Sequence, residues 1–327
     1  MVMADDWPSY LRLHHSGELK RRAAALRGML RSCRLCPHEC NVDREAGETG
    51  FCNAPAHAVY SSACAHRGEE PVLSGFNGSG TIFLTYCNGR CVFCQNYDIS
   101  QQAYGSRISV GELADTCLAL QSRGCHNVNF VTPAHFLPQI VEALDLAVER
   151  GFALPLVYNS NGYDSVEVLR LLDDVFDIYL PDMKYGEEAA GRRLSTLPNY
   201  PEVNRAAVAE MFRQVGPLET DRQGIARRGL IVRHLVLPHN LAHTEGVLRA
   251  IAAIDRRIAV SLMGQYHPSW RANEVPELRR RLVRSEYRAA AETMERLGLV
   301  NGWTQHLNLL DDSHLPDFRG DKWTLDG

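Results

Sequence analysis

From residue 80 onward, short apolar runs alternate with longer amphipathic segments, and this alternation limits the possible fold more than any other feature. The apolar runs have the length and composition of buried strands, and the segments between them have helical periodicity. Six such β–α units in succession indicate a parallel sheet. Six units are too few to close an eight-fold barrel, so we predict an α/β fold with a partial (β/α)6 TIM-like barrel. The predicted strands are residues 81–86, 127–131, 154–159, 176–180, 229–237 and 258–263.

The segments between these runs carry the signals of helices. Ser109 and Glu112 form a capping-box pattern at the start of the first helix, and Gly124 supplies its stop signal. Pro138 lies in the first turn of the second helix, where its missing N–H is tolerated. The predicted helices are residues 109–124, 136–151, 165–174, about 186–214, 244–254 and about 275–298.

The first 79 residues differ in character from the repeating part. Residues 1–32 are rich in helix formers, whereas from residue 33 cysteine, glycine and proline are dense and periodicity disappears. We therefore predict an N-terminal helix with a small cysteine-rich metal-binding module at residues 1–79. The partial barrel would span residues 80–300, and a C-terminal tail would span residues 301–327.

The composition excludes some classes of function. A net charge of −4 argues against a protein held on nucleic acid by phosphate contacts, so no nucleic-acid partner is expected. The acidic N-terminus lacks the apolar core of a signal peptide, and no run approaches the roughly 20 apolar residues that span a bilayer. We expect a cytoplasmic protein without membrane contact, in which thiols stay reduced.

Polar residues follow several of the predicted strands directly. The carboxyl ends of parallel strands meet at one edge of the sheet, and active sites of such folds form there. We therefore expect these side chains to gather on one face. They are Cys87, Thr132, Asn159, Asp182, Lys184 and Gln265.

The segment YCNGRCVFCQ, residues 86–95, carries Cys87, Cys91 and Cys94 in the order C-x3-C-x2-C. A structural zinc usually takes four protein ligands, and no fourth ligand lies close by in the sequence. An iron–sulfur cube held by three cysteines instead leaves one iron open to an external ligand. We favour such a cluster, with zinc, a redox dithiol and buried cysteines as the alternatives.

This spacing after the first strand of a partial barrel resembles the radical S-adenosylmethionine (SAM) superfamily. The resemblance implies a [4Fe–4S] cluster whose open iron is chelated by the amino and carboxylate groups of SAM. One electron from the reduced cluster would cleave the carbon–sulfur bond of the sulfonium and give methionine and a 5′-deoxyadenosyl radical. The radical would abstract hydrogen from an unactivated C–H bond, while the protein orients the cofactors and excludes water and oxygen.

Longer segments are similar to the pyruvate formate-lyase-activating-enzyme-like family. They are SGFNGSGTIFLTYCNGRCVFCQNYDISQ, NVNFVTPAHFLPQI, LVYNSNGY, DIYLPDMKY, RGLIVRHLVLP and MGQYHP, which together span residues 74–268. The similarity implies that Phe93 packs on the adenine. It also places Thr132 and Pro133 where the superfamily has a Gly-Gly-Glu stretch that contacts the methionyl amine, and this chain departs from that stretch.

The same resemblance implies cofactor contacts after later strands. Asn159, Asn161, Asp182 and Lys184 match positions that hold the ribose and carboxylate ends of SAM or lie at the radical. Arg233 interrupts an apolar strand and is expected to point into the barrel. A buried arginine needs an anion, and a cofactor carboxylate would serve.

The segment GEEP, residues 68–71, looks like the Gly-Gly-Glu-Pro of the superfamily but precedes the cysteine loop. It cannot follow the second strand. Glu69 and Glu70 are therefore predicted to be loop residues of the linker, which could still help to close the site.

An earlier group of four cysteines follows the pattern C-x2-C-x3-C-x11-C. Four thiolates are a complete set for tetrahedral zinc or for a second, fully ligated iron–sulfur cluster, and both possibilities stay open. Either metal would stabilise a loop-rich segment. His38 is expected beside this site rather than as a ligand, and the isolated cysteines are expected to be unreactive, with Cys117 in the core. The four cysteines are Cys33, Cys36, Cys40 and Cys52, and the isolated ones are Cys64, Cys117 and Cys125.

The leading hypothesis is a radical SAM enzyme, and the family resemblance implies a glycyl radical enzyme as its protein substrate. Another peptide, an RNA or a small molecule is the alternative substrate. Reduced ferredoxin or flavodoxin would be the electron donor. The rival hypothesis from a different class is an iron–sulfur electron-transfer or scaffold protein, in which a protein ligand caps the fourth iron.

Overall fold

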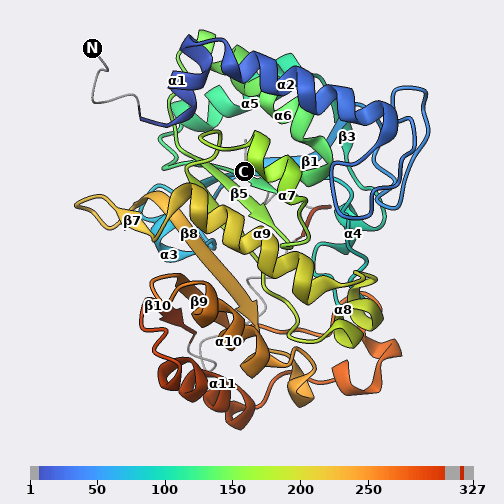
Figure 1. The fold of residues 1–327 in the computed structure, drawn as a ribbon, viewed down its shortest axis with the longest axis vertical. Coiled ribbons are helices and arrows are strands. Elements are labelled where there is room, and N and C mark those ends of the chain that lie inside the picture. Colours follow the sequence, from blue (N-terminus) through green and yellow to red (C-terminus); the bar gives the residue numbers. More distant parts are fainter. Residues whose placement is uncertain (1–6, 306–316, 320–327) are drawn as a thin grey trace.

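A computed structural model describes residues 7–305 and 317–319. All six predicted strands are present, and they lie side by side in chain order as parallel strands. This confirms an α/β fold with a mostly parallel sheet, and the open arrangement is consistent with a partial barrel (Figure 1). The strands are β2 (Ser79–Leu84), β4 (Val128–Val131), β5 (Leu156–Ser160), β6 (Ile178–Pro181), β8 (Ala226–Leu235) and β9 (Ala259–Met263).

Further strands extend the sheet beyond the predicted six. Strand β1 (Ala58–His66) runs antiparallel to β2, and β3 (Ser106–Ile108) continues beyond it. At the other edge, β10 (Gly302–Thr304) pairs in parallel with β9, and the two-residue β7 (Glu219–Thr220) pairs with β8. Residues 34–57 contain turns and irregular backbone, as predicted, but β1 shows that the loop-rich segment ends earlier than expected. Strand β10 likewise lies in the predicted tail.

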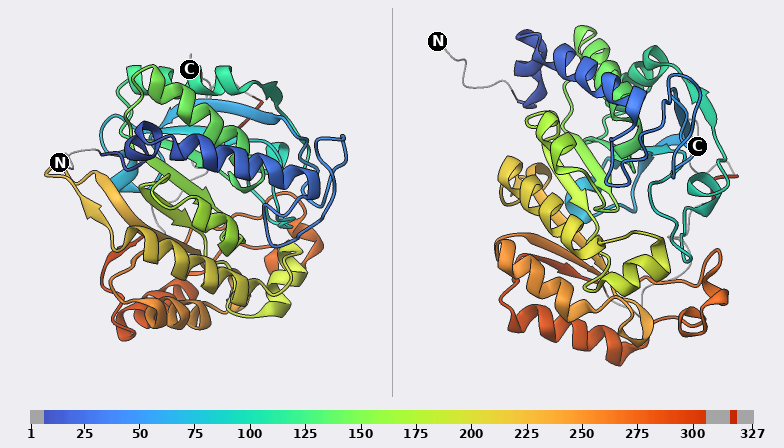
Figure 2. Two further views of the ribbon diagram at one scale, coloured as in Figure 1. Left: turned by 45° about the horizontal axis from the view of Figure 1, so that its top comes forward. Right: turned by 45° about the vertical axis from the view of Figure 1, so that its right-hand side comes forward.

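The helices that follow the strands cover the outer side of the curved sheet (Figure 2). The predicted capping box is confirmed, because Glu112 N donates to Ser109 Oγ at 3.2 Å and Ser109 N donates to Glu112 Oε2 at 2.8 Å. None of the helices in the described ranges is long and apolar enough to cross a membrane. The helices are α1 (Tyr10–His15), α2 (Glu18–Gly28), α3 (Pro71–Ser74), α4 (Tyr97–Ser100), α5 (Val110–Ser122), α6 (Leu137–Glu149), α7 (Val166–Leu171), α8 (Glu188–Ser195), α9 (Tyr200–Val215), α10 (Thr244–Ile254) and α11 (Arg284–Arg296).

The last helix is shorter than the predicted range of about 275–298. Residues 272–278 form two short 3-10 turns, and α11 begins only at Arg284. Pro276 supplies no N–H, which interrupts helical hydrogen bonding at this point. The carboxylate of Glu286 accepts from the backbone N–H of Val283 at 3.1 Å and so stabilises the later start.

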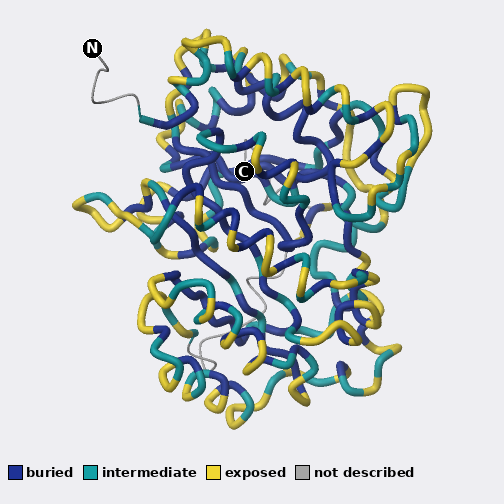
Figure 3. Tube along the Cα trace, viewed as in Figure 1, coloured by how far each residue is buried: buried dark blue, intermediate teal, exposed yellow. Residues whose placement is uncertain are grey.

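The two faces of the sheet differ in polarity. On β8, Leu230 and Val232 point outward into the main core, whereas Ile231 points inward and packs in a smaller cluster with Leu73 of α3. Because side chains alternate along a strand, Arg233 lies on the same inner face as Ile231. Figure 3 shows this central region as buried. Residues 68–74, which precede the first barrel strand, therefore close one end of the barrel with apolar side chains, and we call this segment the floor. The interior above it is polar.

The N-terminal helices pack on the barrel rather than standing apart. Arg27 of α2 forms an ion pair with Glu142 of α6, and His14 Nδ1 lies 2.7 Å from Asp145 Oδ1 of the same helix. Tyr10 is fully buried, and its hydroxyl donates to the carbonyl of Leu154 at 2.7 Å. These contacts anchor residues 10–28 on the outer layer.

Candidate active site

A cavity of about 210 Å³ lies where the carboxyl ends of the strands meet. It is bordered by residues from the cysteine loop, from the segment after β6, and from β8 and β9. The structure thus brings together seven of the side chains that the sequence singled out, Gln265 among them. The other six are Cys91, Phe93, Cys94, Asp182, Lys184 and Arg233.

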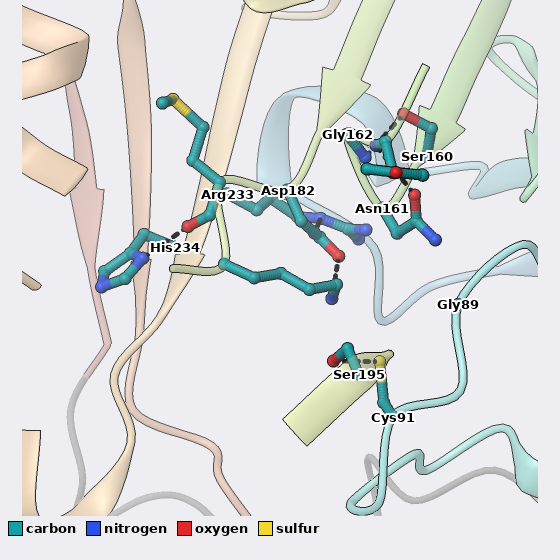
Figure 4. A network of polar contacts seen from close by, with 12 residues as sticks. Gly89, Cys91, Ser160, Asn161, Gly162, Asp182, Ser195, Arg233 and His234 are labelled. Atoms are coloured by element: carbon teal, nitrogen blue, oxygen red, sulfur yellow. Dashed lines mark hydrogen bonds and ion pairs between the residues drawn. The ribbon is translucent and has the colours of Figure 1, made fainter. Parts of the chain in front are cut away.

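A charged network occupies one wall of this cavity (Figure 4). The carboxylate of Asp182 accepts from Lys184 Nζ at 2.6 Å and from Arg233 Nε at 2.9 Å. Burial by itself raises the pKa of Asp182, but the two cations outweigh it and hold this pKa below its usual value. Asp182 is therefore ionised, and the cations hold it in a fixed position.

Arg233 extends the network to Asn159 and Glu69. Arg233 Nη2 donates to Asn159 Oδ1 at 2.7 Å, and Nη1 lies 3.4 Å from Glu69 Oε1. Glu69 Oε2 accepts from Asn129 at 2.9 Å and from Asn159 at 3.2 Å. The side chain of Glu69 is only 10% exposed.

Glu69 and Glu70 lie in the loop between β1 and α3, as predicted for linker residues. Both carboxyls nevertheless point into the interior of the barrel, where Glu69 accepts from Asn129 and Glu70 accepts from Trp303 Nε1 at 2.6 Å. Sequence order hid this arrangement, because the segment precedes the cysteine loop. The available signal was Arg233, whose charge required an anion inside the barrel.

Phe93 lines the cavity, whereas Thr132 is not among its lining residues and lies in the turn after β4. Thr132 has a positive φ of 56°, and its N–H donates to the carbonyl of Asn159 at 2.7 Å, which fixes the turn after β4. Phe93 is buried and packs edge-on against Tyr266, with 5.8 Å between the ring centroids. Phe93 thus contributes an apolar ring to the lining of the cavity.

Asn161 lies beside the cysteine loop rather than in the charged network. Its Nδ2 donates to Asn88 Oδ1 at 2.8 Å and lies 3.5 Å from Cys87 Sγ. Gly162 follows with a φ of +73°, and a Cβ atom there would lie 2.2 Å from the Asp182 carbonyl oxygen. Only glycine fits this turn, and the turn directs the side chain of Asn161 toward the cysteine loop.

The cysteines of this loop are half-buried, and their thiols lie among polar partners. Burial and the neighbouring Cys91 raise the pKa of Cys87 well above its usual value and that of Cys94 to about 11. As free thiols, Cys87 and Cys94 would stay protonated at neutral pH, whereas a reactive dithiol needs a thiolate. Coordination to a metal would remove their protons.

The first cysteine group lies against this loop. His38 Nε2 is 2.8 Å from the carbonyl of Asn88, and the His38 ring stacks on Phe51. Phe51 N donates to Cys40 Sγ at 3.3 Å, and burial raises the pKa of Cys36. His38 therefore bridges the two cysteine segments, a role that its position between two cysteines did not reveal.

The remaining cysteines lie in the core, a position that was predicted for Cys117 alone. They are buried, with Cys117 inside α5. Among residues 7–305 and 317–319, no group of three or more His, Cys, Asp or Glu side chains converges on a point where one metal ion could bind. Each cysteine of a cubane holds a different iron, so such ligands surround a cluster instead of meeting at a point. The other two isolated cysteines are Cys64 and Cys125.

Comparison with known proteins identifies the family. Residues 81–220 match the family model of the radical SAM superfamily. An uncharacterized protein of Methanocaldococcus jannaschii is 34% identical over 283 residues, which cover 84% of this chain and 77% of that protein.

Two solved structures show distant similarity. HydG, a maturase of the [FeFe]-hydrogenase, is 9% identical with a TM-score of 0.44, over 66% of this chain and 49% of that chain. Methylornithine synthase (PylB) is 15% identical with a TM-score of 0.41, over 95% of this chain and 85% of that chain. The family model and the archaeal relative, by contrast, match at the level of sequence, and the chain belongs to the radical SAM superfamily.

Proposed function

We propose that this chain is a radical SAM enzyme in which Cys87, Cys91 and Cys94 hold a [4Fe–4S] cluster. One observation carries the proposal: thiols of a single loop border the same cavity as the network of Asp182, Lys184 and Arg233. The donor set fits the cluster, because it supplies three thiolates and leaves one iron for SAM. Enzymes of this superfamily cleave SAM by means of an iron–sulfur cluster.

The charged network is proposed to bind the polar ends of SAM. Arg233 would hold the carboxylate, with Asp182 and Lys184 fixing its orientation, and Asn159 would contact the ribose. Glu69 supplies a buried carboxylate close to Asn159, and it is proposed to take the methionyl amine that a Gly-Gly-Glu stretch would otherwise bind.

The ring of Phe93 and the backbone turn at Thr132 complete the proposed cofactor site. Phe93 would pack on the adenine, since it is buried at the cavity and presents its ring there. Thr132 would offer its backbone turn to the methionyl end. Asn161, by contrast, is proposed to act on the cysteine loop, because its amide already donates to Asn88 and faces Cys87.

When bound, the cluster and SAM supply a carbon radical that abstracts hydrogen from a substrate. The chain's own residues orient the cofactor and exclude water from the cavity.

The direct test is release of 5′-deoxyadenosine from reduced, anaerobically reconstituted protein given SAM. We expect Cys91→Ala to abolish the release, because the cluster would lose one of its three ligands. Cys117→Ala is the matched control, since Cys117 is a buried core residue away from the cavity. An electron-transfer or scaffold protein would release no deoxyadenosine, and that result would refute the proposal that this chain is a radical SAM enzyme.

The substrate is proposed to be the glycine of a glycyl radical enzyme, with ferredoxin or flavodoxin as electron donor. The support is the similarity of residues 74–268 to the activating-enzyme-like family. A candidate partner should acquire an organic radical signal in electron paramagnetic resonance. Deoxyadenosine release without that signal would favour another peptide, an RNA or a small molecule.

The first cysteine group is proposed to hold a second metal. Phe51 N donates to Cys40 Sγ, a contact that suits a metal-bound thiolate, and His38 connects this segment to the cysteine loop. The identity of this second metal can be determined by measuring the iron and zinc content of anaerobically purified protein. About eight irons per chain indicate a second cubane, and about four with one zinc indicate a structural clip. The four ligands would be Cys33, Cys36, Cys40 and Cys52.

A further inference from the structure

Each of the three thiols of the cysteine loop has a polar side chain of its own beside it. Ser195 Oγ donates to Cys91 Sγ at 2.9 Å, and Ser100 Oγ lies 3.2 Å from Cys94 Sγ. The amide of Asn161 faces Cys87, as described above. The three partners come from the end of α8, the end of α4 and the turn after β5, so three separate elements deliver one group to each sulfur.

The position of Ser195 is fixed by the backbone as well as by its side chain. Arg90 N donates to the Ser195 carbonyl at 2.8 Å, and Val92 N donates to the Leu194 carbonyl at 2.9 Å. The last turn of α8 is therefore hydrogen-bonded to the residues on both sides of Cys91. Ser195 is fully buried, so no water competes for its hydroxyl.

The hydroxyl of Ser195 is also held from its far side. Tyr185 Oη lies 2.6 Å from Ser195 Oγ. Burial raises the pKa of Tyr185, so its phenol keeps its proton. A thiolate has no proton to donate, which leaves one consistent direction: Tyr185 donates to Ser195, and Ser195 donates to Cys91. Such chains strengthen each bond in them.

Hydrogen bonds to cysteine sulfur are among the factors that set the reduction potential of an iron–sulfur cluster. They stabilise the extra negative charge of the reduced state, and so they favour uptake of the electron. A buried donor has more effect than an exposed one, because the local dielectric is low. The three side chains all act in this direction.

We propose that Ser195, Ser100 and Asn161 are positioning residues that raise the reduction potential of the cluster, with Tyr185 acting through Ser195. The proposal rests on the proposed function, because it needs a cluster on the three cysteines. The step concerned adds one electron from an external reductant to the cluster, and no bond forms or breaks in the protein. The side chains orient protons toward sulfur, and Ser195, Ser100 and Asn161 are not among the residues that line the cavity.

The test is a redox titration of reconstituted protein without SAM, followed by electron paramagnetic resonance of the reduced cluster. Ser195→Ala should lower the equilibrium constant for reduction by about tenfold, which for one electron is a fall of about 59 mV. Ser100→Ala should shift the potential in the same direction. Ser195→Thr should restore the wild-type value, and Tyr185→Phe should give a smaller fall.

Ser79→Ala is the matched control, since Ser79 is equally buried but its hydroxyl donates to Asn127 Oδ1 at the opposite end of β2. It should leave the potential unchanged. If Ser195→Ala fails to retain iron, Tyr185→Phe and Ser100→Ala decide the question. Unchanged potentials in these variants, or shifts equal to that of Ser79→Ala, overturn the inference. Wild-type protein that binds no cluster would instead refute the proposed function.

Discussion

Arg233 connects side chains from three distant parts of the chain. It contacts Asp182 at the end of β6, Asn159 at the end of β5 and Glu69 ahead of the barrel. Both carboxylates are mostly buried, and their negative charges would be unfavourable without this guanidinium. Arg233 is therefore a structural requirement of the interior as well as the proposed cofactor contact.

Replacing Arg233 by Gln should lower the free energy of unfolding by about 3–5 kcal/mol, because Asp182 and Glu69 would lose their main counter-charge. Denaturant unfolding under anaerobic conditions measures the change. Arg271→Gln is the control: Arg271 forms an exposed ion pair with Glu274, and no change should be detectable there. Equal effects of the two substitutions would contradict a buried charge network.

At the scale of elements, the sequence predicts the central strands well and the edge strands poorly. Strands buried on both faces are continuous apolar runs, so β2, β5 and β9 stand out in the sequence. Strand β1 contains AVYSSACAH, whose small and polar residues give no such run, and β10 has three residues. Their pairing depends on tertiary neighbours rather than on local pattern.

The same contrast holds for the site. Asp182, Lys184 and Arg233 could be predicted because they follow or interrupt clear strands. Glu69 and Ser195 could not, because Glu69 reaches Asn159 and Ser195 reaches Cys91 only through the packing of α3 and α8. Local patterns place a residue at a strand end, but they do not show which loop covers it.

The turn after β5 provides a test of one element. Gly162 and Gly216 have nearly equal positive φ values, +73° and +71°, but a Cβ at Gly216 meets no atom within 4 Å. Gly216→Ala should cost about 1–3 kcal/mol from backbone strain alone, because a φ of 71° with a ψ of −161° is a conformation that essentially only glycine adopts. Gly162→Ala should cost about 1–3 kcal/mol more, because the new Cβ collides with the Asp182 carbonyl and the side chain of Asn204.

Unfolding free energies of the two glycine variants give the comparison directly. Gly162→Ala should also retain less iron than Gly216→Ala, since it moves Asn161 away from the cysteine loop. Indistinguishable stabilities would show that the turn tolerates a side chain.

The whole molecule contains carboxyl groups that burial keeps protonated to unusually high pH. Burial, helped by the negative Glu69, raises the pKa of Glu70 to about 7. Burial also raises the pKa of Asp164 and of Asp177 to about 6. In each case the folded state holds a proton that the unfolded chain has already lost. Stability from these groups is therefore greatest below pH 4 and declines as the pH rises to about 7.

Glu70→Gln should remove the Glu70 part of that decline. For a pKa raised from 4.5 to about 7, this part is of the order of 3 kcal/mol between pH 4 and pH 8. Unfolding free energies at several pH values, with Trp303 fluorescence as the local signal, measure it. Glu274→Gln should leave the slope above pH 5 unaltered, because the pKa of that exposed carboxyl is lowered. A variant as pH-dependent as the wild type would contradict a buried, protonated Glu70.

The floor formed by residues 68–74 has a consequence for anyone who divides this protein into parts. Leu73 seals the inner apolar cluster, and Glu69 balances Arg233, yet both lie upstream of the first barrel strand. A fragment that starts at residue 80 would lack the floor and the carboxylate of Glu69, which neutralises part of the charge of Arg233. Chimeras that transplant the catalytic half into another protein must therefore carry β1 and the Gly-Glu-Glu-Pro segment with it.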